Sequence, residues 1–255
     1  MIRSGVASVT FRELSPEQIV RLAQDAGLDG IEWGGDVHVV HGDIARATEV
    51  REATEDAGLC VASYGSYYRV GCEQRYEKPP TFDEVLETAV ALRAPTIRVW
   101  AGNRASADAS DAWWKTVLDE TRRVADLAAA AGVRVAFEFH GGTLTDTTES
   151  ACRLLERVNH DNVGGYWQIQ LDRSQAERYA SLEQVMPWLA NLHVFYWEEF
   201  VRKPLAAGAD EWRRYFERAA RDGEDRFALL EFVEDDDPKN LARDAETLNA
   251  LLAVD

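Results

Sequence analysis

The stretch SPEQIVRLAQDAGLDGIEW, residues 15–33, predicts one helix followed by one strand. Ser15 stands at the N-cap position and Gln18 follows three residues later, which is the pattern of a capping box. Apolar residues then recur at helical spacing as far as Gly27, where the helix is expected to end. Gly30–Trp33 is short and mostly apolar, as expected for a buried strand. This stretch therefore contains one helix-to-strand unit of an α/β protein.

The same helix-to-strand junction recurs as AGLDGI at 26–31, AGLCV at 57–61 and AGVRV at 131–135. The expected strands are residues 5–10, 30–33, 60–64, 96–101, 134–140, 163–168, 191–197 and 226–233. The expected helices are residues 15–27, 43–58, a segment that begins at 81, 111–131, 147–157, 181–189, 210–221 and 238–253. This alternation predicts an α/β protein with a single (β/α)8 TIM barrel that spans residues 1–255. An open doubly wound sheet is the alternative, although no GxGxxG motif follows the first strand.

The formal net charge of −17 disfavours nucleic acid and anionic membrane surfaces as partners. The N-terminus lacks the charged start, long apolar stretch and cleavage site of a signal peptide. No apolar run approaches the ~20 residues of a membrane span. We therefore expect a cytoplasmic protein with a small-molecule partner.

The polar stretch Gly65–Pro80 is expected to be a long loop between a strand and the next helix. It contains Tyr67, Tyr68 and Tyr76. Such a loop could cap a site at the strand ends or reach a neighbouring subunit, so a homo-oligomer stays open.

Four polar residues end four successive apolar strands in the second half of the chain. They are Glu138, Gln168, His193 and Glu231. Burying a carboxylate or an imidazole without a partner costs several kcal/mol, so such groups are usually paired or bound to a metal. Any one of them alone could be a strand-end ion pair or a hydrogen-bonded core residue. Four on consecutive strands of a barrel favour convergence on one cation, because active sites of such barrels lie at the C-terminal strand ends.

Other polar and aromatic residues are expected at the same end of the barrel and are candidates for substrate binding. They are Glu32, Trp33, His38, Tyr64, Arg98, Trp100, His140 and Trp197. Glu32 could equally form an ion pair with Arg98, and His38 could be an ordinary loop histidine. His140 shares a strand face with Glu138, so it could bind the substrate or orient that carboxylate.

These residues give the chain a resemblance to the xylose isomerase-like TIM barrels, which include sugar isomerases, sugar epimerases, inosose dehydratases and AP endonucleases. The resemblance covers essentially the whole chain and is carried by AQDAGLDGIEW at 23–33, the strands of Glu138 and His193, and LEF at 230–232. It implies a divalent metal held by the four strand-end residues named above. The family usually has Asp where this chain has Gln168, so weaker metal binding is expected. Ligands of this kind suit manganese, which we favour, or magnesium, cobalt or zinc.

In the epimerase branch, the resemblance implies that Glu138 and Glu231 remove and return a proton on opposite faces of a ketose through a cis-enediolate. The leading hypothesis is therefore a metal-dependent sugar or polyol isomerase or epimerase. The alternative is a metal-dependent lyase that dehydrates a keto-inositol or a related keto-polyol. Two further hypotheses are a non-catalytic sugar-binding barrel, which Gln168 favours, and an AP endonuclease relative, which the net charge opposes.

Overall fold

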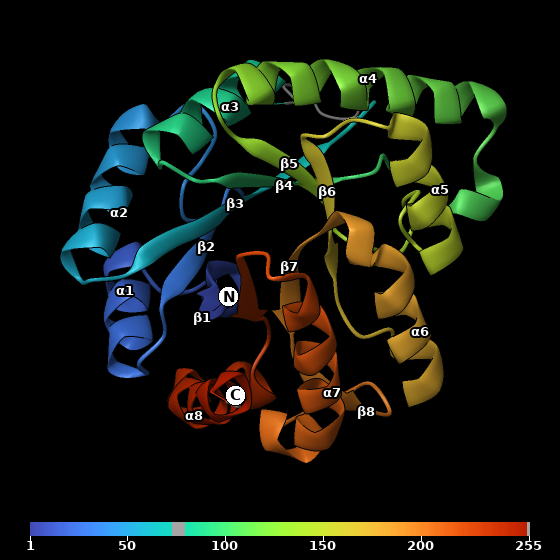
Figure 1. Cartoon of the computed structure of the whole chain (residues 1–255). Helices are drawn as coiled ribbons and strands as arrows, with labels where there is room; N and C mark the ends of the chain where they lie inside the picture. The colour runs from blue at the N-terminus through green and yellow to red at the C-terminus, as the bar shows by residue number, and fades with distance from the viewer. Residues whose placement is uncertain (73–79, 254–255) are drawn as a thin grey trace.

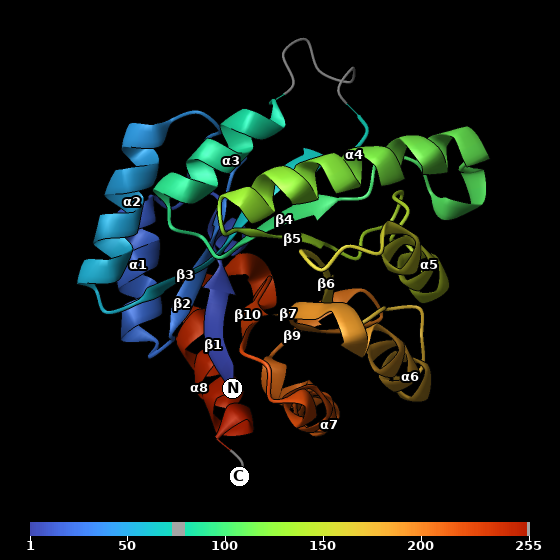
Figure 2. The ribbon, with the colours of Figure 1, turned by 45° about the horizontal axis from the view of Figure 1, so that its top comes forward.

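The computed structural model describes residues 1–72 and 80–253, so Tyr76 of the expected loop lies outside the described residues. Eight parallel strands form a closed barrel in the order β1-β10-β7-β6-β5-β4-β3-β2. They are β1 (Ile2–Ala7), β2 (Gly30–Gly34), β3 (Cys60–Arg69), β4 (Thr96–Trp100), β5 (Arg134–Phe137), β6 (Val163–Trp167), β7 (Leu189–Val194) and β10 (Arg226–Leu230). Figure 1 shows the helices around this ring, and Figure 2 shows β1 beside β10, the pair that closes it. The expected α/β fold, a single (β/α)8 TIM barrel, is confirmed.

Most helices of the outer layer begin after a residue whose side chain caps them. The helices of this layer are α1 (Pro16–Asp25), α2 (Ile44–Asp56), α3 (Phe82–Ala91), α4 (Asp111–Ala130), α5 (Thr148–Val158), α6 (Gln175–Val185), α7 (Ala209–Ala219) and α8 (Leu241–Leu252). Ser15 and Thr81 form the expected capping boxes with Gln18 and Glu84, and Asp43 caps α2. Across the described ranges, no helix combines the length and the apolar character needed to cross a membrane.

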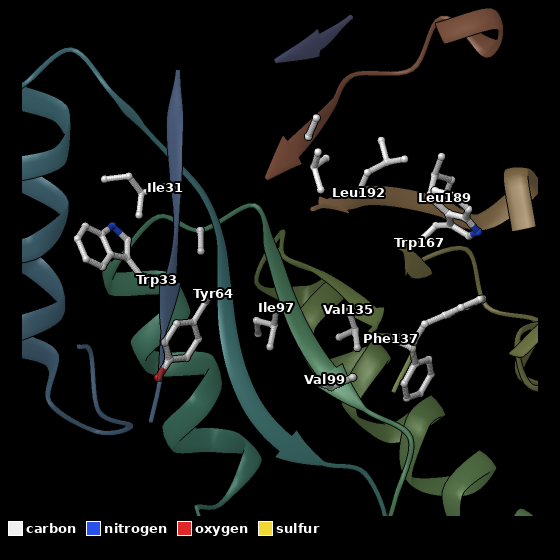
Figure 3. Close-up of a cluster of buried hydrophobic side chains, with 14 of the residues drawn as sticks. Ile31, Trp33, Tyr64, Ile97, Val99, Val135, Phe137, Trp167, Leu189 and Leu192 are labelled. Atoms are coloured by element: carbon white, nitrogen blue, oxygen red, sulfur yellow. The ribbon is translucent and has the colours of Figure 1, made fainter. Parts of the chain in front are cut away.

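Two apolar layers lie on the two faces of the barrel strands. The larger layer packs between the strands and the helices, and Figure 3 shows part of it, including Ile31, Trp33 and Tyr64. A smaller cluster occupies the barrel interior and consists of Ala62, Ala136, Tyr166, Ala190, Phe227 and Leu229. Because side chains alternate along a strand, β3, β5, β6, β7 and β10 supply residues to both layers.

Two early boundaries differ from the expected ones. β1 ends at Ala7, because Ser8–Phe11 turn into a short 3-10 helix instead of continuing the strand. β3 continues to Arg69, so the beginning of the expected Gly65–Pro80 loop is strand and pairs with β4.

Two later boundaries also differ. α6 begins at Gln175 instead of residue 181, because Ser174 and Glu177 form a capping box further upstream. β7 ends at Val194, and the chain continues into an unexpected antiparallel hairpin of β8 (Tyr196–Glu198) and β9 (Val201–Lys203). This hairpin places additional residues beside the C-terminal ends of the barrel strands.

Candidate metal and active site

The four strand-end residues meet at the C-terminal end of the barrel. Glu138, Gln168 and Glu231 directly follow the last residues of β5, β6 and β10, and His193 is next to last in β7. Glu138, Gln168 and Glu231 stand two residues after Ala136, Tyr166 and Leu229 of the interior cluster. His193 stands two residues after Asn191, which donates to the Tyr166 hydroxyl at 3.0 Å. The alternation of strand side chains therefore turns all four toward the barrel axis.

The donor atoms of these residues lie close enough to share one ion. The ligand atoms of Glu138, His193 and Glu231, all buried, lie within 4.8 Å of one another. Nδ1 of His193 is 3.2 Å from Oε1 of Gln168 and 3.3 Å from Oε2 of Glu231. Carboxylate, amide and imidazole donors gathered at one point fit a divalent cation such as manganese, magnesium or zinc.

Glu32 lies beneath this cluster and orients the histidine. Its Oε1 atom is 3.3 Å from Nε2 of His193, the ring nitrogen that faces away from Gln168. Ser63 and Arg98 donate further hydrogen bonds to Glu32 at 2.7 and 2.8 Å. A carboxylate on the second ring nitrogen fixes the orientation of a metal-binding histidine. Glu32 is absent from the described cavity lining and its oxygens are occupied within the barrel, so its geometry fits a residue that positions His193 better than one that contacts a substrate.

The carboxylates and the cations of the cluster shift one another's pKa values. Burial acts to lower the pKa of His193, but the carboxylates of Glu231 and Glu32 outweigh it and raise that pKa to about 10. Burial acts to raise the pKa of Glu32, yet Arg98 and His193 hold it well below its ordinary value. His193 and Arg98 likewise lower the pKa of Glu231 against the effect of burial. A divalent cation would take over the charge balance that the imidazolium proton provides.

Arg98 connects the two sides of the site. Its guanidinium donates to Glu32 and Glu138, and the side chain is only 1% exposed. Trp100 also donates to Glu138, at 2.5 Å. A Cβ atom at Gly65 would come within 2.5 Å of Nη2 of Arg98, so only glycine leaves room for the guanidinium here. The expected pairing of Arg98 with Glu32 is present, and Arg98 lies in the floor of the site.

A cavity of about 510 Å³ opens above the cluster. Among the described residues, its lining comprises Arg12, Tyr67, Trp100, Glu138, Phe139, His140, Gly141, Thr145, Asp146, Gln168, Ile169, Gln170, Leu171, Asp172, Phe195, Trp197, Phe200, Glu231 and Phe232. The cavity thus contains three of the expected substrate-binding residues, Trp100, His140 and Trp197. His140 stacks on Trp100 with ring centroids 4.0 Å apart.

Three other expected substrate-binding residues lie elsewhere, which corrects the sequence-based expectation. Trp33 is fully buried against the helices and donates to Thr54 of α2 at 3.2 Å. Tyr64 is buried in the same layer and donates to the carbonyl of Val39 at 2.8 Å. Strand alternation turns both rings away from the axis.

His38 is buried between the loops that follow β1 and β2. Its Nδ1 atom lies 3.0 Å from Oγ of Ser8, and its ring meets that of Trp33 edge to face. His38 is absent from the described cavity lining. It therefore stabilises the junction of these loops.

Arg12 and Tyr67 are among the cavity residues that were not expected site residues. Arg12 follows the 3-10 turn after β1, and Tyr67 lies near the end of β3. Arg12 ion-pairs with Asp36 and donates to the Tyr67 hydroxyl at 3.0 Å. The sequence placed Tyr67 in a loop that could cap the site, but no local pattern distinguished Arg12 from an ordinary loop arginine.

Residues 20–251 match the model of a protein family described as "Xylose isomerase-like TIM barrel". The chain therefore belongs to this family, as the resemblance predicted. A 3-dehydroshikimate dehydratase of Bacillus anthracis is 28% identical over 205 residues, which are 75% of this chain and 71% of that protein.

Solved structures share the fold across nearly the whole chain. The probable 3-DHS dehydratase AsbF of Bacillus anthracis has a TM-score of 0.79 at 22% identity, covering 98% of this chain and 99% of that chain. A D-psicose 3-epimerase of Clostridium cellulolyticum H10, solved with D-tagatose, has a TM-score of 0.74 at 15% identity, covering 99% and 100%. A xylose isomerase-like protein of Mycobacterium smegmatis, solved with magnesium, has a TM-score of 0.74 at 16% identity, covering 99% and 98%. Similar barrels thus belong to dehydratases and epimerases alike, and the local chemistry must discriminate between them.

Proposed function

We propose that this protein is a metal-dependent dehydratase of a cyclic hydroxyketone that carries a carboxylate, with 3-dehydroshikimate as the first substrate to test. The observation that carries this proposal is the lining of the cavity above the cluster of Glu138, His193 and Glu231. The 28% identical dehydratase supports the same choice.

Aromatic rings form much of the cavity wall. They belong to Tyr67, Trp100, Phe139, Phe195, Trp197, Phe200 and Phe232. Such a wall favours a flat, partly unsaturated ring over a sugar whose every face carries hydroxyls. Dehydration of 3-dehydroshikimate ends in an aromatic dihydroxybenzoate, whose flat ring can stack on aromatic side chains.

One cationic side chain at the cavity wall can bind an acidic group of a substrate. Arg12 is the one arginine or lysine among the described cavity-lining residues. A guanidinium can bind a carboxylate through two parallel hydrogen bonds, so Arg12 is the group we assign to the substrate carboxylate. Its ion pair with Asp36 holds the guanidinium in place.

Glu138, Gln168, His193 and Glu231 would hold the metal. When bound, a divalent cation would polarise the ketone and lower the pKa of the adjacent carbon-bound proton. Manganese remains our preferred ion, because the donor set is rich in oxygen. Gln168 brings no charge, so two glutamates just balance a divalent ion.

We assign proton removal to Glu231. Glu138 accepts hydrogen bonds from both Arg98 and Trp100, which hold its carboxylate in one position. His193 is the one ionic partner of Glu231 within the described residues. The carboxylate of Glu231 therefore has fewer partners than that of Glu138 and is less constrained by them.

The test is incubation of the purified protein with 3-dehydroshikimate and manganese. We expect loss of one water and the ultraviolet absorbance of a dihydroxybenzoate. Removal of the metal with a chelator should stop product formation, and its return should restore it. If the metal-loaded protein releases no aromatic product, the proposal is wrong.

Sugar or polyol epimerisation is the second candidate function. The observation in its favour is the pair of carboxylates, Glu138 and Glu231, brought to one cluster from β5 and β10. One carboxylate could remove a proton from a ketose and the other return it on the opposite face. Deuterium uptake from heavy water into ketoses, together with formation of an epimer, would establish this function in place of dehydration.

A further inference from the structure

Tyr67 has an unusual backbone at the edge of the cavity. Its φ angle is +55°, a left-handed conformation that an aromatic residue rarely adopts. The pairing of β3 with β4 shifts between Gly65 and Arg69, so Tyr67 lies within an irregularity of the strand. Such irregularities re-aim side chains near active sites, and the strained residue persists because its surroundings hold it there.

Two cations surround the Tyr67 side chain. Arg12 donates to the hydroxyl oxygen through Nη2 at 3.0 Å. The guanidinium carbon of Arg98 lies 5.0 Å from the ring centroid. Trp100, which donates to Glu138, meets the ring edge to face at 5.5 Å. Tyr67 thus contacts Arg98 in the floor of the candidate site, and Arg12 and Trp100 in its wall.

The Tyr67 hydroxyl has a proton available for donation. Its oxygen accepts from Arg12, and within the described ranges the hydroxyl donates to no acceptor of the protein. Burial raises the pKa of Tyr67 to about 12, although Arg98 and Arg12 act in the opposite direction, so the phenol is protonated at neutral pH. A cation at the oxygen also stabilises the phenolate that forms when the proton leaves.

His140, the other candidate donor at this wall, is arranged differently. Its Nδ1 atom lies 2.7 Å from the carbonyl oxygen of Gly141. A carbonyl can only accept, so Nδ1 carries the proton in the neutral ring and Nε2 is an acceptor. The neutral imidazole therefore has no proton to give at the nitrogen that remains free.

We propose that Tyr67 is the catalytic acid that protonates the leaving hydroxyl during dehydration. This inference rests on the proposed function and names a residue and a step within it. Arg12 then has two tasks, since it can bind the substrate carboxylate while its Nη2 atom donates to the phenol oxygen.

The proposed step balances without an oxidant or a reductant. Glu231 takes the proton from the hydroxyl-bearing carbon beside the ketone, and the electron pair passes into the enolate of the substrate. That pair then forms a carbon–carbon double bond as the next carbon–oxygen bond breaks, and the departing hydroxyl takes the Tyr67 proton to leave as water. The phenolate regains a proton from solvent and Glu231 releases its proton to solvent. Transfer of a ring proton to the ketone oxygen completes the aromatic product.

The test compares Tyr67→Phe with the wild type in heavy water. The variant retains the ring and loses the acid, so we expect kcat to fall by about 100- to 10,000-fold. Proton removal should continue, so unreacted 3-dehydroshikimate should gain deuterium at the hydroxyl-bearing carbon beside the ketone. Mass spectrometry and NMR of the recovered substrate would measure this exchange.

Tyr68→Phe is the matched control, because Tyr68 donates to Glu120 of α4 in the outer layer. It should keep the wild-type kcat. Metal content and thermal unfolding would show that both variants are folded and loaded. The inference is overturned if Tyr67→Phe keeps the wild-type kcat, or if a folded, metal-loaded variant loses exchange and turnover equally. If the wild type itself makes no aromatic product, the proposed function fails instead.

Discussion

Glu32 and Trp33 are neighbours on β2 and lie in two different environments. Glu32 faces the barrel axis, where Ser63, Arg98 and His193 surround its carboxylate. Trp33 faces the helices, where it packs in the apolar core and donates to Thr54. The face of β2 toward the barrel axis thus carries charged groups that neutralise one another, and the face toward the helices carries apolar side chains that fill the core. This difference separates residues that support function from residues that support stability, and four predictions test it.

Glu231→Gln should have the largest effect among changes to the axis face. It removes the proposed base and one ionised metal ligand, so turnover should fall on the order of 100- to 10,000-fold. Product formation at saturating metal would measure the loss. Glu87→Gln, on the exposed face of α3, is the control and should retain full activity. A Glu231→Gln protein with unchanged turnover would remove Glu231 from the proposed chemistry.

Trp33→Ala should act on stability alone. Truncating a fully buried tryptophan should lower the free energy of unfolding by about 3–5 kcal/mol, because it leaves a cavity in the layer between strand and helix. Urea unfolding would measure this, and Trp33→Phe should lose less. The folded fraction should bind metal as the wild type does. If the Trp33→Ala protein keeps its stability but loses turnover, Trp33 has a role in the active site.

Glu32→Gln should weaken metal binding about 10- to 100-fold, because the carboxylate that orients His193 is replaced by an amide. Isothermal titration with manganese would measure the affinity. Ser63→Ala removes a hydrogen bond to the same carboxylate but keeps its charge, so its effect should be smaller. Equal affinities for Glu32→Gln and the wild type would show that the axis network does not position the histidine.

Metal binding should release close to one proton at pH 7. In the metal-free protein the pKa of His193 is raised to about 10, so the ring is protonated at pH 7 and must lose that proton to bind an ion through Nδ1. The apparent affinity should therefore rise about tenfold per pH unit below that pKa. Titration in two buffers of different ionisation enthalpy measures the released proton. Metal binding without proton release would show that His193 does not lose a proton to become a metal ligand.

The sequence predicted much of the barrel because its signals are local. Capping boxes at Ser15 and Thr81 and glycine-ended helices follow from residues close together in the chain. The capping box of Ser174 and Glu177 is equally local, and it begins α6 upstream of the expected residue 181. The bend after Ala7 depends on contacts with distant segments, since Ser8 accepts from Gly34 and Thr10 accepts from Phe232. The hairpin after β7 is local, but its turn residues Glu199 and Phe200 adopt positive φ angles without the glycine or asparagine that usually marks such a turn.

The candidate site was predicted to the level of its four strand-end residues. Period-2 alternation and the C-terminal location of barrel sites suffice to bring Glu138, Gln168, His193 and Glu231 together. The predicted site also included Trp33 and Tyr64, which face the helices. Trp33 directly follows Glu32, so strand alternation already places the two on opposite faces. Tyr64 ended only the expected strand, because β3 continues to Arg69.

The sequence by itself determined the alternation of strands and helices, the family and the four polar strand ends, since each depends on residue type and spacing. The tertiary structure alone decided that Glu32 supports His193, that Arg98 joins Glu32 to Glu138, and that Arg12 reaches Tyr67. These contacts join residues from different strands and loops. Their geometry follows from barrel closure, strand register and the irregularity in β3, and none of these can be read from one segment of the chain.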